Sequence, residues 1–158
     1  MANMGLSDLR LVEPAEFPGP EATARAASAN HVLENARIYS TLDEAIADSG
    51  FVVGATARSR SIAWPSSDPA SVMTELITQS RASKVSLLFG REASGLTNEE
   101  LDRCQRHVRI PTNEDFPSLN LAAAVLIFGY ELHRAYSLQG GCSDSGMDRI
   151  LPLASAAG

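Results

Sequence analysis

Three stretches of the chain combine small residues with polar or charged ones: residues 54–60 (GATARSR), 90–96 (GREASGL) and 111–120 (PTNEDFPSLN). Each of them follows an apolar run that is typical of a buried strand. Gly and Ala leave the backbone bare, so a ligand can approach it closely. If the three stretches meet in the fold, their chemistry is that of a ligand site built largely from backbone groups and small side chains.

Each of these features also has an ordinary structural interpretation. Isolated glycines commonly serve only to make turns, and Arg91 with Glu92 could be a solvated ion pair worth under about 1 kcal/mol. Ser118 can cap the helix predicted after it by accepting hydrogen bonds from free backbone N–H groups. Asn120 is then expected in the first turn of that helix, where its side chain could face a ligand.

The elements that would position the three stretches alternate along the chain. Apolar runs predict five strands, at residues 9–13, 36–39, 51–55, 85–89 and 107–110. Helices are predicted between and after them, with capping signals at Thr41, Asp68 and Thr97. Such alternation is typical of an α/β fold with a parallel sheet and helices on both faces. In these sheets ligands bind at the carboxyl ends of the strands, where all three stretches lie.

Composition narrows the classes of protein further. With 158 residues, 44% of them hydrophobic, the chain is about one domain, and it contains no apolar run near the ~18 residues of a membrane span. A secretory signal is not evident, so a cytoplasmic protein is expected. Cys104 and Cys142 form no CxxC motif, and no metal site is expected. The net charge is −6, but arginines and a lysine gather between residues 58 and 109, which can still give one basic face.

Several familiar signatures are missing. The sequence has no GxGxxG, no GxxxxGK[ST] and no GxSxG motif. A conventional dinucleotide fold is therefore unsupported, a P-loop is excluded, and nothing points to a serine hydrolase.

The three stretches and their flanks, read together, resemble the SPOUT methyltransferases. The resemblance rests on MGLSDLRLVEP, VVGATARSR, FGREASGLTNEEL and IPTNEDFPSLNLAAAV, and it covers roughly residues 1–136. It is greatest to the branch that methylates the ribose 2′-oxygen of the pyrimidine at position 32 of tRNA. The resemblance implies a trefoil knot in the C-terminal half, S-adenosylmethionine as methyl donor, tRNA as substrate, and a homodimer with its site at the subunit interface.

The resemblance also implies roles for particular residues. Catalytic roles are expected for Glu92, Ser118 and Asn120, and RNA contacts for Arg58, Arg60 and Arg91. The residues expected to hold S-adenosylmethionine come from all three stretches: Ala55, Thr56, Ala57, Gly90, Ile110, Pro117, Ser118 and Leu119.

The expected domain division follows from the same comparison. Residues 1–138 would form the methyltransferase domain without its first strand and most of its first helix, which in the family carry an N-x-G-x-x-x-R motif with the proposed catalytic arginine. Residues 139–158 would be a linker and the start of a C-terminal extension. Two alternatives stay open: a catalytically inactive fragment that binds S-adenosylmethionine or RNA, and a 2′-O-methyltransferase acting on rRNA or on another position of tRNA.

Overall fold

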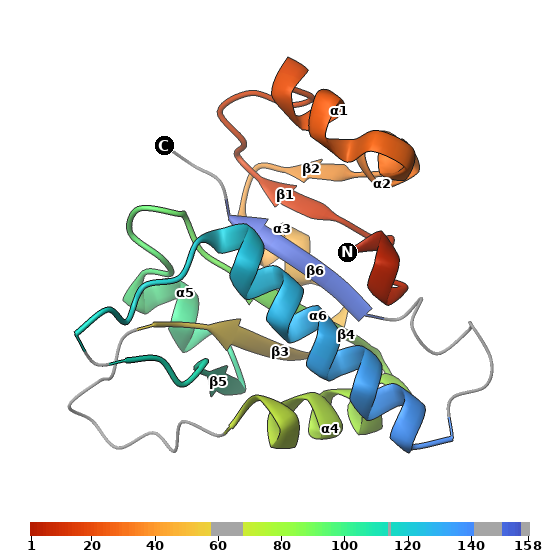
Figure 1. The fold of residues 1–158 in the computed structure, drawn as a ribbon, viewed down its shortest axis with the longest axis vertical. Coiled ribbons are helices and arrows are strands. Elements are labelled where there is room, and N and C mark those ends of the chain that lie inside the picture. The colour runs from red at the N-terminus through yellow and green to blue at the C-terminus, as the bar shows by residue number, and fades with distance from the viewer. Residues whose placement is uncertain (58–67, 114, 141–149, 156–158) are drawn as a thin grey trace.

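A single parallel sheet of six strands organises the chain in the computed structural model, which describes residues 1–57, 68–113, 115–140 and 150–155 (Figure 1). The strand order is β2-β1-β6-β4-β3-β5, and every neighbouring pair is parallel. The strands are β1 Arg10–Val12, β2 Arg37–Tyr39, β3 Ser49–Ala55, β4 Lys84–Phe89, β5 Arg106–Val108 and β6 Ile150–Ser155.

Helices cover both faces of this sheet, as the alternation of elements predicts. On β3, Val53 faces a large core cluster with α4 and α6, whereas its neighbour Val52 faces a smaller cluster with α3 and α5. Successive side chains of a strand point to opposite faces, so this division marks two covered faces. The helical segments are η1 Ala2–Met4, α1 Pro20–Ala26, η2 Ala27–Ala29, α2 Asn30–Glu34, α3 Leu42–Ile46, α4 Pro69–Ser80, α5 Asn98–Asp102 and α6 Leu121–Leu138.

The predicted helix starts at Thr41, Asp68 and Thr97 are confirmed. Each side chain accepts a hydrogen bond from a backbone N–H in the first turn of α3, α4 or α5. At α5 the reciprocal bond is also present, because the Glu100 carboxylate accepts from the Thr97 N–H at 2.7 Å. Such a capping box satisfies two N–H groups that the helix itself leaves free.

The start of α6 differs from the prediction. Asn120, and not Ser118, is the N-cap, and its Oδ1 accepts from the N–H groups of Ala122 at 2.9 Å and Ala123 at 3.3 Å. Serine and asparagine cap helices about equally well, so the choice is made by tertiary contacts. Asn120 therefore lies before the first turn of the helix, and Ser118 belongs to the loop that leads to it.

The sixth strand was not predicted. Residues 150–155 were expected to lead into an extension, yet β6 lies inside the sheet between β1 and β4. Its backbone pairs with Val85–Phe89 of β4 and with Arg10–Val12 of β1, and the Ile150 side chain is buried in the larger core cluster. The edges of the sheet are therefore β2 and β5.

Candidate ligand site

A cavity of about 200 Å³ opens at the carboxyl ends of β3, β4 and β5. Its walls come from the three stretches that the sequence singled out, together with the first two turns of α6. The lining residues are Ala55, Thr56, Ala57, Phe89, Gly90, Arg91, Glu92, Ala93, Ser94, Gly95, Leu96, Ile110, Pro117, Ser118, Leu119, Leu121, Ala124 and Phe128. All eight residues expected to hold the cofactor are thus brought together in one wall.

The loop after β4 closes on itself beside the cavity. Gly95 has a φ of 68°, in the left-handed region, and its N–H donates to the Arg91 carbonyl at 2.8 Å. A Cβ placed on Gly90 would lie 2.1 Å from the Gly95 carbonyl carbon and 2.2 Å from the Leu96 nitrogen. The loop therefore takes this shape only because residue 90 has no side chain.

The Arg91 guanidinium is held against the start of α5. Its Nη1 lies 3.1 and 3.2 Å from the two Glu100 carboxylate oxygens, and this contact is partly buried. Glu100 is also the capping-box carboxylate of Thr97. One carboxylate thereby fixes both the second loop and the helix after it, so Arg91 has a structural partner besides any contact it makes with RNA.

Glu92 and Asn120 join the second and third stretches at the rim. Asn120 Nδ2 donates to Glu92 Oε1 at 2.8 Å, while Asn120 Oδ1 caps α6. Ser118 lines the cavity two residues before the cap. The expected catalytic residues therefore lie close together: Glu92 and Ser118 on the wall, and Asn120 behind Glu92, where it fixes the carboxylate.

The first stretch is tied by its backbone to β5, the strand that leads into the third stretch. The Thr56 N–H donates to the Val108 carbonyl at 3.0 Å, which holds residues 55–57 beside the end of β5. Deeper in the cavity, the Phe89 and Phe128 rings pack at a centroid distance of 5.8 Å. A wall that combines apolar side chains with nearly as much polar surface suits a ligand that carries both an uncharged ring and polar groups.

Sequence reasoning missed part of the wall. Four apolar residues also line the cavity: Phe89, Leu121, Ala124 and Phe128. Their apolar side chains predicted a place in the core and did not indicate a ligand site. Their positions carried a usable signal, since Phe89 ends a strand beside a suspected loop and the other three lie in the first turns of the following helix.

Some predictions fall outside what the structure describes. Arg58 and Arg60 lie within residues 58–67, so the expected RNA contacts of these two residues are untested. Across the described residues, His, Cys, Asp and Glu side chains form no group of three or more that could hold a metal ion. In the same part of the chain, no helix is long and apolar enough to cross a membrane.

Comparison with known proteins gives one consistent result. Residues 1–130 match the model of the SpoU rRNA Methylase family. The chain is 50% identical over 137 residues to the tRNA (cytidine/uridine/adenosine-2′-O-)-methyltransferase TrmJ of Pseudomonas aeruginosa, a match that covers 86% of this chain and 53% of that protein. It is 41% identical over 155 residues to TrmJ of Photorhabdus laumondii, with 98% of this chain and 64% of that protein covered.

Solved structures agree with the sequence matches. A probable methylase family protein from Haemophilus influenzae superposes with a TM-score of 0.83 at 38% identity, covering 89% of this chain and 59% of that one. TrmJ from Z. mobilis superposes with a TM-score of 0.77 at 36% identity, covering 85% and 60%. The chain spans between half and two thirds of the length of these curated relatives.

Proposed function

Since the chain belongs to the SpoU rRNA methylase family, we propose that the cavity binds S-adenosylmethionine and serves methyl transfer to a ribose 2′-oxygen of tRNA. The observation that carries the proposal is the convergence of three separate loops on one small cavity whose wall combines apolar and polar surface. The P. aeruginosa and P. laumondii relatives are named as tRNA 2′-O-methyltransferases. We propose the same reaction here, at the pyrimidine in position 32 of the anticodon loop.

The residues present fit the proposed cofactor. Ala55, Ala57, Gly90 and Pro117 offer small or apolar surface with backbone groups between them, which suits an adenine ring and an aliphatic chain. When bound, S-adenosylmethionine supplies an electrophilic methyl group for attack by the ribose 2′-hydroxyl. The three loops hold the reacting groups in position, and such alignment supplies a large part of the rate.

The rim residues have distinct proposed roles. Glu92 would contact the substrate on the RNA side of the cavity, where a carboxylate can accept a hydrogen bond from a hydroxyl group. Asn120 would act as a positioning residue, because its amide fixes the Glu92 carboxylate at 2.8 Å. Ser118 would contribute a hydroxyl group to the wall between them.

Calorimetric titration with S-adenosylhomocysteine tests the cavity. Ala124→Trp places an indole in the cavity wall. Ala122→Trp adds the same group at an exposed position two residues earlier on α6. We expect binding to the wild type and to Ala122→Trp, and at least a tenfold weaker affinity for Ala124→Trp. Equal binding by all three proteins would show that the ligand site lies elsewhere.

Methyl transfer is tested separately from binding. The assay measures transfer of labelled methyl from S-adenosylmethionine to tRNA, followed by mapping of the modified nucleotide. Product at the 2′-oxygen of nucleotide 32 supports the proposal. Product at another position of tRNA, or in rRNA, would contradict the proposed target and favour the alternative 2′-O-methyltransferase. Ligand binding by this chain without turnover would favour the alternative of a binding module.

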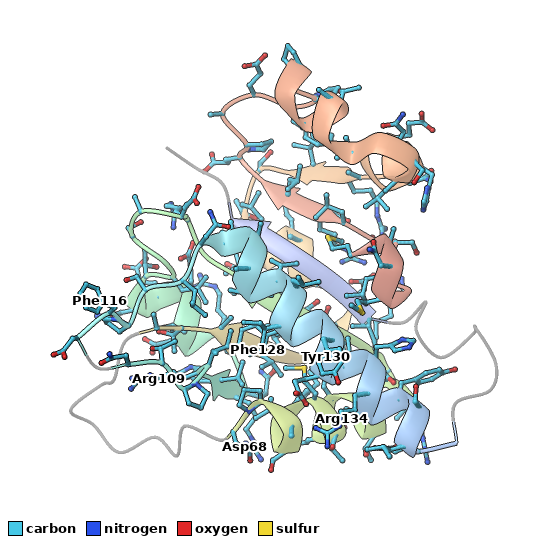
Figure 2. The ribbon with its side chains drawn as sticks, in the orientation of Figure 1. Asp68, Arg109, Phe116, Phe128, Tyr130 and Arg134 are labelled. Atoms are coloured by element: carbon cyan, nitrogen blue, oxygen red, sulfur yellow. The ribbon has the colours of Figure 1, made fainter. Side chains whose placement is uncertain are left out.

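The proposed RNA contacts are tested by salt dependence. Each lost phosphate contact lowers the slope of log K against log salt concentration by about one. We expect this change for Arg58→Ala and Arg60→Ala, but not for Arg134→Ala, whose side chain lies on the far part of α6 (Figure 2). An unchanged slope in the first two variants would place the RNA elsewhere.

We also propose that two copies pair through α6. Leu126 and Tyr130, one turn apart, are each 53% exposed despite their apolar character, and Leu119 before the helix is 38% exposed. Apolar side chains gathered on one surface commonly mark an interface. Leu126→Asp should reduce the mass measured by light scattering to that of one chain. Ile38→Asp, a matched exposed position on the edge strand β2, should leave the mass unchanged.

The finer fold feature, a trefoil knot, is proposed as well. Its support is the strand order β4-β3-β5 together with the return of the chain from β5 to α6, which packs on α4 beside the sheet. A crystal structure with continuous density through residues 109–121 would decide the path.

A further inference from the structure

The third stretch carries an aromatic side chain that lines no part of the cavity. Phe116 is 79% exposed, more than any other large apolar side chain in the described ranges. It nevertheless directly precedes Pro117 and Ser118, which do line the cavity. Figure 2 shows it on the outer part of the loop between β5 and α6, well away from Tyr130. Phe116 therefore contributes little to the core and stands at the mouth of the candidate site.

Hydrogen bonds within the loop fix the backbone on both sides of Phe116. The Phe116 N–H donates to the Asn113 carbonyl at 3.1 Å, and the Asp115 N–H donates to Asn113 Oδ1 at 3.0 Å. The Thr112 hydroxyl donates to the Pro117 carbonyl at 3.2 Å. The ring is thus presented to solvent from a defined turn, so less entropy is lost when a ligand covers it.

A cation lies at the base of the same loop. Arg109 directly follows β5 and is half-buried, and Figure 2 shows it on the same side of the molecule as Phe116. Arg91, Arg103 and Arg106 each pair with a carboxylate. No acidic side chain in the described part of the chain pairs with Arg109. Its guanidinium is therefore open to an anionic ligand, and phosphate is the anion that arginine binds best.

Asp115 determines which part of a nucleotide can lie at the ring. Its exposed carboxylate is next to Phe116 in the chain, and it repels a phosphate group. A nucleobase carries no charge and stacks on an aromatic ring, which stabilises binding by about 1–3 kcal/mol per base. The favourable arrangement therefore has a base at Phe116 and a phosphate at Arg109.

We propose that Phe116 is a stacking platform for an unpaired base of the substrate RNA, and that Arg109 contacts a phosphate of the same strand. This role rests on the proposed methyl transfer to RNA, because the cavity beside Pro117 places the reacting ribose next to the platform. A base held in a duplex cannot reach the ring, so the platform selects a loop of RNA over a helix. Stacking tolerates every base, so Phe116 selects for an unpaired nucleotide and not for one base.

Coupling between the Phe116 side chain and individual RNA bases tests this role. Synthetic hairpins of the tRNA anticodon arm are prepared, each lacking one loop base, and anisotropy gives their affinity for the full chain with S-adenosylhomocysteine present. We expect loss of the base at one loop position to weaken binding by the wild type about tenfold, but to have little effect on Phe116→Ala. Phe116→Trp should restore this sensitivity. Leu138→Ala, matched in exposure at the end of α6, should behave as the wild type does.

The phosphate contact has its own readout. Arg109→Ala should lower the slope of log K against log salt concentration by about one and leave the coupled loop position unchanged. Arg134→Ala should keep the wild-type slope. An unchanged slope for Arg109→Ala would remove Arg109 from the RNA contact.

Two results would overturn the platform itself. Equal sensitivity of the wild type and Phe116→Ala to every missing base would show that no base stacks on the ring. A lower mass for Phe116→Ala in light scattering, with that equal sensitivity, would assign the ring to contact between copies instead. Wild-type binding of S-adenosylhomocysteine and methylation of the intact hairpin distinguish the two levels: if both hold while the coupling is absent, only the platform is wrong. If both are absent as well, the proposed function fails with it.

Discussion

Replacing Gly90 with alanine is the sharpest test of how the second loop is built. The added Cβ would lie 2.1, 2.2 and 2.5 Å from atoms of the Gly95–Leu96 backbone. Real Cβ atoms do not approach this closely, and backbone cannot move aside as a flexible side chain can. Overpacking typically costs about 1–3 kcal/mol, and we expect Gly90→Ala to cost about 3 kcal/mol.

The matched control is Gly95→Ala in the same loop. A Cβ there meets no atom within 4 Å, but the φ of 68° is unfavourable for alanine, at a cost of about 1 kcal/mol. In a chain of this size, 1 kcal/mol shifts the melting temperature by about 2–4 °C. Gly90→Ala should therefore melt about 6–12 °C below the wild type and Gly95→Ala about 2–4 °C below.

Scanning calorimetry measures both shifts, and titration with S-adenosylhomocysteine reports on the cavity. Gly90→Ala should also weaken ligand binding, because the loop must open to admit the methyl group. If Gly90→Ala melts within 2 °C of the wild type, the close contact between residue 90 and the Gly95–Leu96 backbone is not a real constraint on the loop.

Three further predictions concern the core. Asp48→Ala removes the carboxylate that accepts two hydrogen bonds from the buried Arg10 guanidinium and leaves it only one carboxylate, that of Asp8 at 3.8 Å. The variant should lower the free energy of unfolding by about 2 kcal/mol, a reduced figure because Asp48 is 42% exposed. Hydrogen bonds from Arg10 hold the pKa of Asp48 well below its usual range. The wild type therefore keeps this contribution to stability above about pH 4 and loses it as the pH falls further. Urea titrations at several pH values should show this loss in the wild type but not in Asp48→Ala. Gly54→Ala places a Cβ 2.8 Å from Cys104 Sγ, so it should cost about 1–3 kcal/mol alone and less when combined with Cys104→Ala. Burial raises the pKa of the Cys104 thiol to about 12, so in a Cys142→Ser background a thiol reagent at pH 8 should react only after unfolding, and rapid reaction of the folded chain would contradict that burial.

The wall of the cavity was largely predictable because its signals are local. Each of the three loops begins where an apolar strand ends, and parallel strands place their carboxyl ends at one edge of the sheet. Ala55, Gly90 and Ile110 can therefore be grouped from the sequence alone. Glu92 and Asn120 were grouped through the family resemblance instead, because a hydrogen bond between residues 28 positions apart leaves no local signal.

Other features depend on contacts that no local pattern encodes. Ser118 and Asn120 have nearly equal capping strength, and the bond from Asn120 to Glu92 accompanies the choice. Gly90 was expected to give a ligand access to the backbone, which stays a prediction, and the structure adds a second need, since the missing side chain makes room for Gly95 and Leu96. These are tertiary effects, which routinely override single-residue preferences.

β6 was missed for a related reason. A run of six residues with a central proline is a weak strand signal, and it follows a Gly/Ser-rich stretch that is typical of a linker. Its place in the sheet depends on pairing with β1 and β4, whose residues lie about 60 to 140 positions earlier in the chain. Residues 150–155 alone give no sign of these pairs.

The order of synthesis gives the central strand a further consequence. Roughly 140 residues separate β1 from β6, so a ribosome working at 5–20 residues per second completes β6 about 7–30 s after β1. β4 is complete only after residue 89, so for the last roughly 60 residues, about 3–12 s at the same rate, β1 and β4 each present an open row of backbone groups. The nascent chain must therefore pass through a state with two unpaired strands facing each other, in which the Asp48 carboxylate is the bridge between them. Ribosome-associated chaperones would meet this chain with its sheet still open at the middle.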